Sequence, residues 1–183
     1  MNLPNKITLL RVCLIPAFLV VYLVQPFGEI VSMWLALVLF VAAAITDAID
    51  GYLARKLSLV TNFGKLMDPL ADKLLVCSAF VAFTATGSLP VWAVILLISR
   101  EFYLSGLRQL ALEQGTVMAA SPSAKLKTTM QITLIVYVLL PPPFTLLVID
   151  IVILVLVILT VVASVYSAVD YTVKNISILK KQG

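Results

Sequence analysis

Histidine is absent from the 183 residues of the chain. Its absence excludes Ser-His-Asp and Cys-His catalysis, imidazole metal ligands and a phosphohistidine intermediate. Any chemistry therefore uses carboxylates, basic side chains and hydroxyls. The two cysteines, Cys13 and Cys77, both lie within apolar segments, which favours helix packing over a disulfide.

Charged residues are also scarce, at 12% of the chain against 62% hydrophobic residues. That balance gives far more apolar surface than a soluble domain of this size buries in one core. Apolar runs reach roughly 18 to 25 residues, about the length with which a helix crosses roughly 30 Å of hydrocarbon. We count six such runs, at residues 8–26, 31–54, 66–85, 89–111, 126–141 and 144–170. The sequence therefore predicts an all-α integral membrane protein with six transmembrane helices, in a single domain over residues 1–183.

The breaks between the runs predict the orientation of the chain. Short breaks rich in proline and glycine are typical of tight turns, and they fall at residues 25–28, 87–90 and 141–143. Three longer gaps, near residues 55–65, 112–125 and 171–183, hold most of the basic residues, and all 13 lysines and arginines fall on the same side as these gaps or nearer to it. By the positive-inside rule, both termini then face the cytoplasm. The net charge of +4 agrees with this topology and with an attraction to anionic lipid, and it does not indicate a nucleic-acid-binding protein.

The first apolar run has basic residues ahead of it and no small-x-small cleavage site near its end. We therefore expect a retained helix rather than a signal peptide. No internal repeat and no low-complexity segment interrupts the chain.

Four of the nine acidic residues crowd into one short stretch of the sequence. Asp47 and Asp50 are three apart near the end of the second apolar run, and Asp68 and Asp72 are four apart in the third. In helices these spacings place each pair on one face. A carboxylate at the centre of a membrane helix costs about 2.5 to 3.5 kcal/mol, and four close together repel one another. Two divalent cations would balance them, and all-oxygen ligation suits Mg²⁺ or Mn²⁺ better than zinc.

Two such ions are a common device for in-line substitution at phosphorus, so the aspartates favour phosphoryl chemistry. Gly51, Ala54 and Gly64 would let a ligand approach closely, although tight helix packing explains each glycine equally well. Arg55 follows directly and offers a fixed positive charge to an arriving phosphate.

Taken together, these residues resemble the signature of the CDP-alcohol phosphatidyltransferase family at every fixed position. The matching residues are Asp47, Asp50, Gly51, Ala54, Arg55, Gly64, Asp68 and Asp72. A second set of residues resembles the bacterial phosphatidylglycerophosphate synthases within that family. It comprises Asn2 to Thr8 with Arg11, Asp68 to Lys73, Ser99 to Glu101, Gly106 to Arg108, and Lys125 with Lys127 and Thr128.

The resemblance implies the CDP-alcohol phosphotransferase fold, with six membrane helices, a polar cavity open to the cytoplasm and usually a homodimer in the bacterial cytoplasmic membrane. It implies that the four aspartates hold two divalent cations, Mg²⁺ or Mn²⁺. The implied substrates are CDP-diacylglycerol and sn-glycerol 3-phosphate, and the products are phosphatidylglycerol phosphate and CMP. Asp72 would also act as general base toward the acceptor hydroxyl. The CDP portion would contact Asn5, Thr8, Asp50, Gly51, Ala54, Arg55, Gly64 and Asp68.

Glycerol 3-phosphate carries an anionic group, so its pocket should hold additional cations. The candidates are Arg100, Arg108, Lys125 and Lys127. Alternatively, Arg100 and Glu101 form a structural ion pair with each other or with Lys73, and the other three basic residues bind lipid phosphates or enforce topology. Ala124 stands where the relatives are expected to have glycine, which leaves the shape of this pocket open.

Two other functions remain open from the sequence. A sister enzyme of the same family would use inositol phosphate, serine or phosphatidylglycerol as acceptor. The shared motif indicates binding of CDP and of metal ions, and it does not identify the acceptor. A cation or proton transporter would also place aspartates in membrane helices. The clustering of the acidic residues near one leaflet and the lack of an inverted repeat disfavour the transporter.

Overall fold

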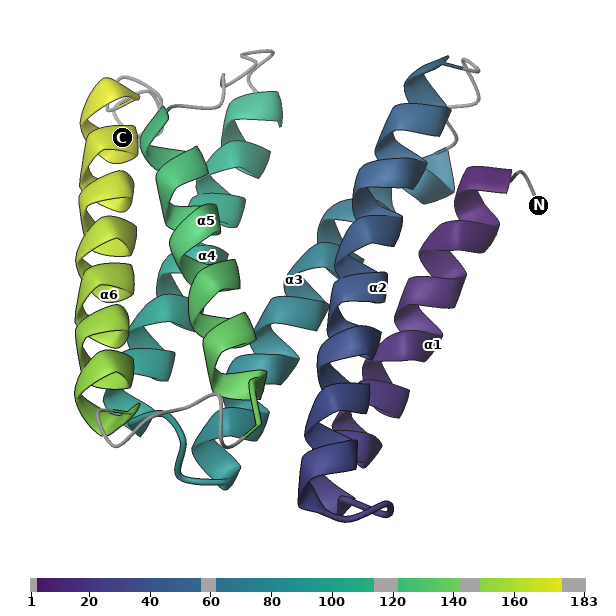
Figure 1. Ribbon diagram of the computed structural model, residues 1–183. Helices are drawn as coiled ribbons and strands as arrows, with labels where there is room; N and C mark the ends of the chain where they lie inside the picture. Colours follow the sequence, from purple (N-terminus) through teal and green to yellow (C-terminus); the bar gives the residue numbers. More distant parts are fainter. Residues whose placement is uncertain (1–2, 57–61, 114–121, 142–148, 176–183) are drawn as a thin grey trace. The chain divides into compact units, whose positions relative to one another are not determined.

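The computed structural model describes residues 3–56, 62–113, 122–141 and 149–175 (Figure 1). Within these ranges, only the backbone is described at residues 3–8, 47–56, 62–69, 72, 113, 122–124 and 149–150. The described residues form α-helices and no strand. The helices are α1 (Leu3–Val24), α2 (Glu29–Lys56), α3 (Asn62–Ala85), α4 (Val91–Glu113), α5 (Pro122–Leu139) and α6 (Ile149–Lys174).

Each predicted apolar run corresponds to one helix, so the all-α prediction is confirmed for the described residues. Several helix ends differ from the predicted bounds by a few residues, and polar residues extend α2 and α5 beyond the starts of their apolar runs. Glu29 adds a carboxylate to the first turn of α2, where the partial positive charge of the helix terminus favours it. Pro122 is the first residue of α5. Amide groups in the first turn of a helix have no acceptor within the helix, so the amide hydrogen that proline lacks costs no hydrogen bond there.

Two of the predicted tight turns lie in the described ranges, and glycine makes both possible. Gly28 has a φ of 81° and Gly87 a φ of 76°, a left-handed backbone that side chains with a Cβ rarely adopt. The amide of Gly28 donates to the carbonyl of Gln25 at 3.1 Å, which closes the first turn. The first turn reverses the chain within a few residues, and α1 and α2, which flank it, pack as neighbours.

The chain divides into two compact units, Met1–Ser88 with Leu139–Leu146, and Leu89–Val138 with Leu147–Gly183. In the first unit, α1 packs against both α2 and α3, and α2 contacts α3. Buried aromatic rings fill its core. Phe18 lies 6.0 Å from Phe40 between ring centroids, and Tyr22 meets Phe83 edge-on at 5.2 Å.

A cluster of hydroxyl groups joins α1 to the end of α3. The Tyr22 hydroxyl lies 3.0 Å from Thr86 Oγ1 and 3.4 Å from Ser88 Oγ, and these two oxygens are 2.9 Å apart. Thr86 also donates toward the carbonyls of Ala82 and Phe83, which are among the last acceptors of the helix. The cluster therefore supplies polar partners at a helix end that is otherwise apolar.

In the second unit, α4 packs against α6, and α5 contributes fully buried side chains such as Leu134 and Ile135. Leu104, Leu107 and Tyr171 form a buried cluster between α4 and α6. Thr160 of α6 is fully buried and donates to the backbone carbonyl of Met130 in α5 at 3.5 Å. Side chains from all three helices thus meet inside this unit.

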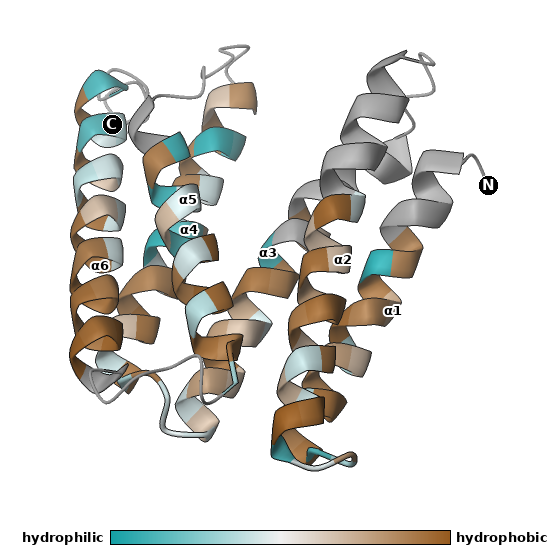
Figure 2. Ribbon diagram, viewed as in Figure 1, coloured by the Kyte–Doolittle hydropathy of each residue, from teal (hydrophilic) through white to brown (hydrophobic). Residues whose placement is uncertain are grey.

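Large apolar side chains remain exposed along the helices of both units. Examples are Val24 and Val38 in the first unit and Ile151, Val162 and Val173 in the second. Figure 2 shows the corresponding hydrophobic stretches along α1, α2 and α6. Within the described residues, Glu29–Thr46 and Ile151–Lys174 are long and apolar enough to cross a membrane. These surfaces are those of a membrane protein, because apolar patches of this extent are unfavourable in contact with water.

We predict that Tyr22→Phe lowers the free energy of unfolding by about 1 kcal/mol, because the ring keeps its packing and only the hydroxyl contacts are lost. Thermal unfolding in detergent, followed by tryptophan fluorescence, should show a lower midpoint. Tyr166→Phe is the matched control, since Tyr166 is exposed on α6, and it should unfold at the wild-type midpoint. A wild-type midpoint for Tyr22→Phe would contradict a stabilising role for the hydroxyl cluster.

Candidate active site

The backbone places the four motif aspartates on two helices of the same unit. Asp47 and Asp50 lie on α2, and Asp68 and Asp72 lie on α3. Both segments are helical, so the spacings of three and four do put each pair of positions on one helix face. The side chains of all four aspartates lie outside the described residues, as do those of the predicted CDP contacts Asn5, Thr8, Gly51, Ala54, Arg55 and Gly64.

The donor set of this motif suits hard divalent cations. Four carboxylates on two contacting helices offer oxygen ligands alone, which is the chemistry that Mg²⁺ and Mn²⁺ prefer. Among the side chains that the structure describes, no three His, Cys, Asp or Glu residues gather into a metal-binding group. The assignment of the individual ligands stays a prediction.

Arg11 of α1 is buried beside the start of the motif. Its side chain is 0% exposed, and its Nε donates to Thr46 Oγ1 of α2 at 3.4 Å. Thr46 directly precedes Asp47 and is itself fixed, since its hydroxyl donates to the carbonyl of Ala43 at 2.6 Å. A buried guanidinium is held by its hydrogen bonds, and this one therefore fixes α1 against α2 one residue before the first aspartate. Sequence reasoning had placed Arg11 in the matching pattern without assigning it a role.

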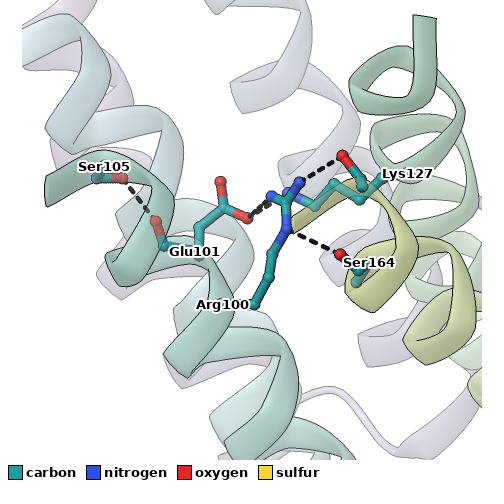
Figure 3. Close-up of polar contacts among 6 residues, drawn as sticks. Arg100, Glu101, Ser105, Lys127 and Ser164 are labelled. Carbon is teal, nitrogen blue, oxygen red and sulfur yellow. Dashed lines mark hydrogen bonds and ion pairs between the residues drawn. The ribbon is translucent and has the colours of Figure 1, made fainter. Parts of the chain in front are cut away.

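The second unit contains a buried polar cluster, which we define as Arg100 and Glu101 of α4, Lys127 of α5, and Ser164 and Ser167 of α6 (Figure 3). Arg100 Nη1 donates to Glu101 Oε2 at 3.1 Å, and Lys127 Nζ donates to the same oxygen. The side chains of Arg100 and Lys127 are only 8% and 7% exposed, and that of Glu101 is 22% exposed. One carboxylate oxygen thus joins two basic residues that the sequence had suggested for phosphate binding.

Arg100 is also fastened to α6 by the rest of its guanidinium group. Nη2 donates to Ser167 Oγ at 2.9 Å, and Nε donates to the backbone carbonyl of Ser164 at 3.2 Å. The planar guanidinium therefore serves a different acceptor with each of its three nitrogens, a geometry that no ammonium group reproduces. The structural pairing of Arg100 with Glu101, one of the alternatives open from the sequence, is present, and it extends to Lys127.

The other two predicted phosphate ligands lie in more open positions. Arg108 is exposed, its Nε donates to the Tyr171 hydroxyl at 3.2 Å, and its guanidinium carbon lies 5.3 Å from the centre of that ring. Lys125 is exposed at the beginning of α5. The structure thus separates the four candidates into a buried pair, Arg100 and Lys127, and an exposed pair.

Sequence reasoning missed the partners of these cations on α6. Buried hydroxyl-bearing residues recur there at intervals of four, three and four, at Thr160, Ser164, Ser167 and Tyr171. That spacing follows one face of a helix, and a polar stripe on an otherwise apolar helix is a readable signal of a polar contact. Ser164 Oγ is buried with no hydrogen-bond partner in the described structure, while its carbonyl receives Arg100.

The sequence of the chain matches the profile of the family described as CDP-alcohol phosphatidyltransferase over residues 1–166. The chain therefore belongs to the CDP-alcohol phosphatidyltransferase family, as its aspartate motif predicted. This is a family of enzymes that employ divalent metal ions.

Individual relatives share much of the chain. The CDP-diacylglycerol–glycerol-3-phosphate 3-phosphatidyltransferase of Bacillus subtilis is 48% identical over 141 residues, covering 72% of this chain and 72% of the relative. A protein of the same name from Rickettsia typhi is 39% identical over 130 residues, 71% of each chain. A probable phosphatidylglycerophosphate synthase of Mycobacterium tuberculosis is 36% identical over 173 residues, 94% of this chain and 81% of the relative.

We predict that Arg100→Lys lowers the free energy of unfolding by about 2 kcal/mol, because an ammonium group donates from a single nitrogen and cannot reach three acceptors that the guanidinium reaches from three separate nitrogens. Arg108→Lys is the matched control, with an expected loss below about 1 kcal/mol at its exposed position. Thermal unfolding of both variants in the same detergent compares them directly. Equal losses in the two variants would show that the buried cluster does not fasten α4 to α6.

Proposed function

We propose that the protein transfers the phosphatidyl group of CDP-diacylglycerol to sn-glycerol 3-phosphate, giving phosphatidylglycerol phosphate and CMP. The observation that carries this proposal is the complete aspartate motif on two contacting helices of a family member. Relatives named for this reaction, at up to 48% identity among those compared, support glycerol 3-phosphate as the acceptor.

The proposal includes a place for the enzyme in the cell. All six helices span the bacterial cytoplasmic membrane in one domain, both termini face the cytoplasm, and the aspartate motif lines a cavity open to that side. The positive-inside distribution of the 13 basic residues supports this orientation. A lipid substrate then reaches the site from the bilayer, while glycerol 3-phosphate arrives from the cytoplasm. A homodimer is the expected assembly.

Asp47, Asp50, Asp68 and Asp72 would hold two divalent cations, Mg²⁺ or Mn²⁺. When bound, such ions neutralise the diphosphate of the donor lipid and stabilise the oxygens that enter and leave at phosphorus. Four carboxylates against two divalent cations balance in charge, which makes the cluster compatible with an apolar bundle.

The residues of the chain bind the donor and move one proton. Asn5, Thr8, Asp50, Gly51, Ala54, Arg55, Gly64 and Asp68 would line the site of the CDP portion. Asp72 accepts the proton of the acceptor hydroxyl, whose oxygen attacks the phosphorus bonded to diacylglycerol. The bond from that phosphorus to the CMP oxygen breaks, and CMP leaves. No covalent bond to the protein is needed, which agrees with a chain that has no histidine.

The phosphate of the acceptor would meet basic residues drawn from Arg100, Arg108, Lys125 and Lys127. Burial supports Arg100 and Lys127 as the ligands of this phosphate, because an ion pair is strongest where water is excluded. Inositol phosphate, serine and phosphatidylglycerol are the competing acceptors within the same chemistry.

We predict that purified protein with CDP-diacylglycerol and Mg²⁺ or Mn²⁺ releases CMP when glycerol 3-phosphate is added, and that a chelator stops the release. Asp72→Asn should lower kcat by about a hundredfold or more, since general-base catalysis contributes roughly 10² to 10⁴. Asp170→Asn is the matched control, because Asp170 lies on α6 and pairs with Lys174 outside the motif, and it should retain activity.

The acceptor is tested by adding serine, inositol phosphate and phosphatidylglycerol in separate reactions. Release with one of these in place of glycerol 3-phosphate would assign the protein to a sister activity. A folded protein that is inactive with all four acceptors would overturn the enzymatic proposal and favour ion transport.

A further inference from the structure

A buried arginine links the first two helices of the first unit. Arg11 of α1 is 0% exposed, and its Nε donates to Thr46 Oγ1 of α2 at 3.4 Å. Burying a guanidinium costs hydration and side-chain entropy, so a buried arginine is accounted for by the contacts that it makes. This contact joins two helices that pack against each other inside one unit.

Thr46 offers the guanidinium an acceptor with a fixed orientation. Its hydroxyl donates to the carbonyl of Ala43 at 2.6 Å, three residues earlier in α2. Because the hydroxyl hydrogen is used in that bond, the Thr46 oxygen meets Arg11 with its lone pairs. The contact therefore fixes the rotation of α2 toward α1 and the level at which the two helices meet.

The helix faces that meet at this contact continue to positions predicted to bind the CDP portion of the donor. On α1, position 8 lies three residues before Arg11, and on α2, position 50 lies four residues after Thr46. Residues three or four apart in a helix share a face. The face of α1 that contacts α2 therefore includes position 8, and the face of α2 that contacts α1 includes position 50.

The directions of the two helices bring these two positions to the same level. The tight turn at residues 25–28 joins α1 to α2, which run in opposite directions (Figure 1). A step from Arg11 toward the start of α1 thus matches a step from Thr46 toward the end of α2. Positions 8 and 50 both lie about one turn, or about 5 Å, beyond the contact. A displacement of α2 by one residue would move position 50 by about 1.5 Å and turn it by about 100°.

On the basis of the proposed function, we propose that Arg11 is a positioning residue for the donor lipid and that it acts through Thr46. The contact aligns α1 with α2 and so brings the predicted CDP contacts Thr8 and Asp50 to one level. The ligand whose binding depends on this alignment is the cytidine diphosphate portion of CDP-diacylglycerol. The residues proposed for the acceptor lie on other helices, so the constants for the two substrates should respond differently.

The test substitution is Thr46→Val, which keeps the shape of the side chain and removes the hydroxyl that accepts from Arg11. The KM for CDP-diacylglycerol should rise by roughly tenfold, because contacts that orient the ligands of a site from outside typically contribute roughly tenfold to a hundredfold. Titration calorimetry with CDP and Mg²⁺ should show a similar loss of affinity, while the KM for glycerol 3-phosphate stays at the wild-type value. Thr84→Val is the matched control, since Thr84 likewise donates to a carbonyl three residues earlier but lies near the end of α3, and it should leave all three constants unchanged.

A double-mutant cycle shows whether Arg11 acts through Thr46. Arg11→Met alone should raise the KM for CDP-diacylglycerol, and adding Thr46→Val to that variant should raise it no further, because the contact is already gone. Arg11→Lys keeps the charge and a donor without the planar fork, so its KM should fall between those of the wild type and Arg11→Met. If Arg11→Met does not fold, Arg11→Lys takes its place in the cycle.

Each other outcome overturns the inference. A wild-type KM for CDP-diacylglycerol in Thr46→Val would show that the contact does not position the donor. Equal increases in the KM for both substrates would show a general structural role, and additive effects in the cycle would show that Arg11 acts independently of Thr46. Failure of the proposed function is distinguishable, because wild-type protein would then release no CMP from CDP-diacylglycerol with any of the four acceptors, and the role of Arg11 would fall with it.

Discussion

A charged side chain inside an apolar helical bundle has to find its partner within the protein, because hydrocarbon offers none. This constraint organises the polar residues of both units. Arg11 is buried against Thr46, and Arg100 and Lys127 share Glu101. The four motif aspartates obey the same rule if two divalent cations join them. Several residues that the sequence suggested as functional groups, such as Arg100 and Lys127, thus also make structural contacts.

Each of the two units, described by itself, contains candidate site residues. The first unit has the aspartate motif and the buried arginine next to it, and the second has the cluster of basic residues that suits an acceptor phosphate. A donor shared by the whole family and an acceptor that differs among its members make separate demands on the protein.

The sequence alone predicted six helices, the aspartate pairs on α2 and α3, and the family, because apolar length and motif spacing are local properties of the chain. It did not predict which basic residues are buried together. Arg100, Glu101 and Lys127 are brought to one point by the packing of α4, α5 and α6, and tertiary contacts of that kind have no local signature. The spacing of the hydroxyl stripe on α6 could be read from the sequence, but its partners Arg100 and Arg108 could not. The roles of the individual site residues stay predictions.

The hydroxyl stripe also determines how α6 is aligned. Purely aliphatic helices slide and rotate against each other at little cost, since one methyl contact replaces another. Here Ser164 and Ser167 meet Arg100, while Tyr171 meets Arg108 one turn further on. Inserting a single residue between Ser167 and Tyr171 would turn the tyrosine by about 100° away from its arginine. Polar contacts in this unit thus fix the register of α6. Insertions and deletions in α6 are tolerated only outside the segment from Ser164 to Tyr171.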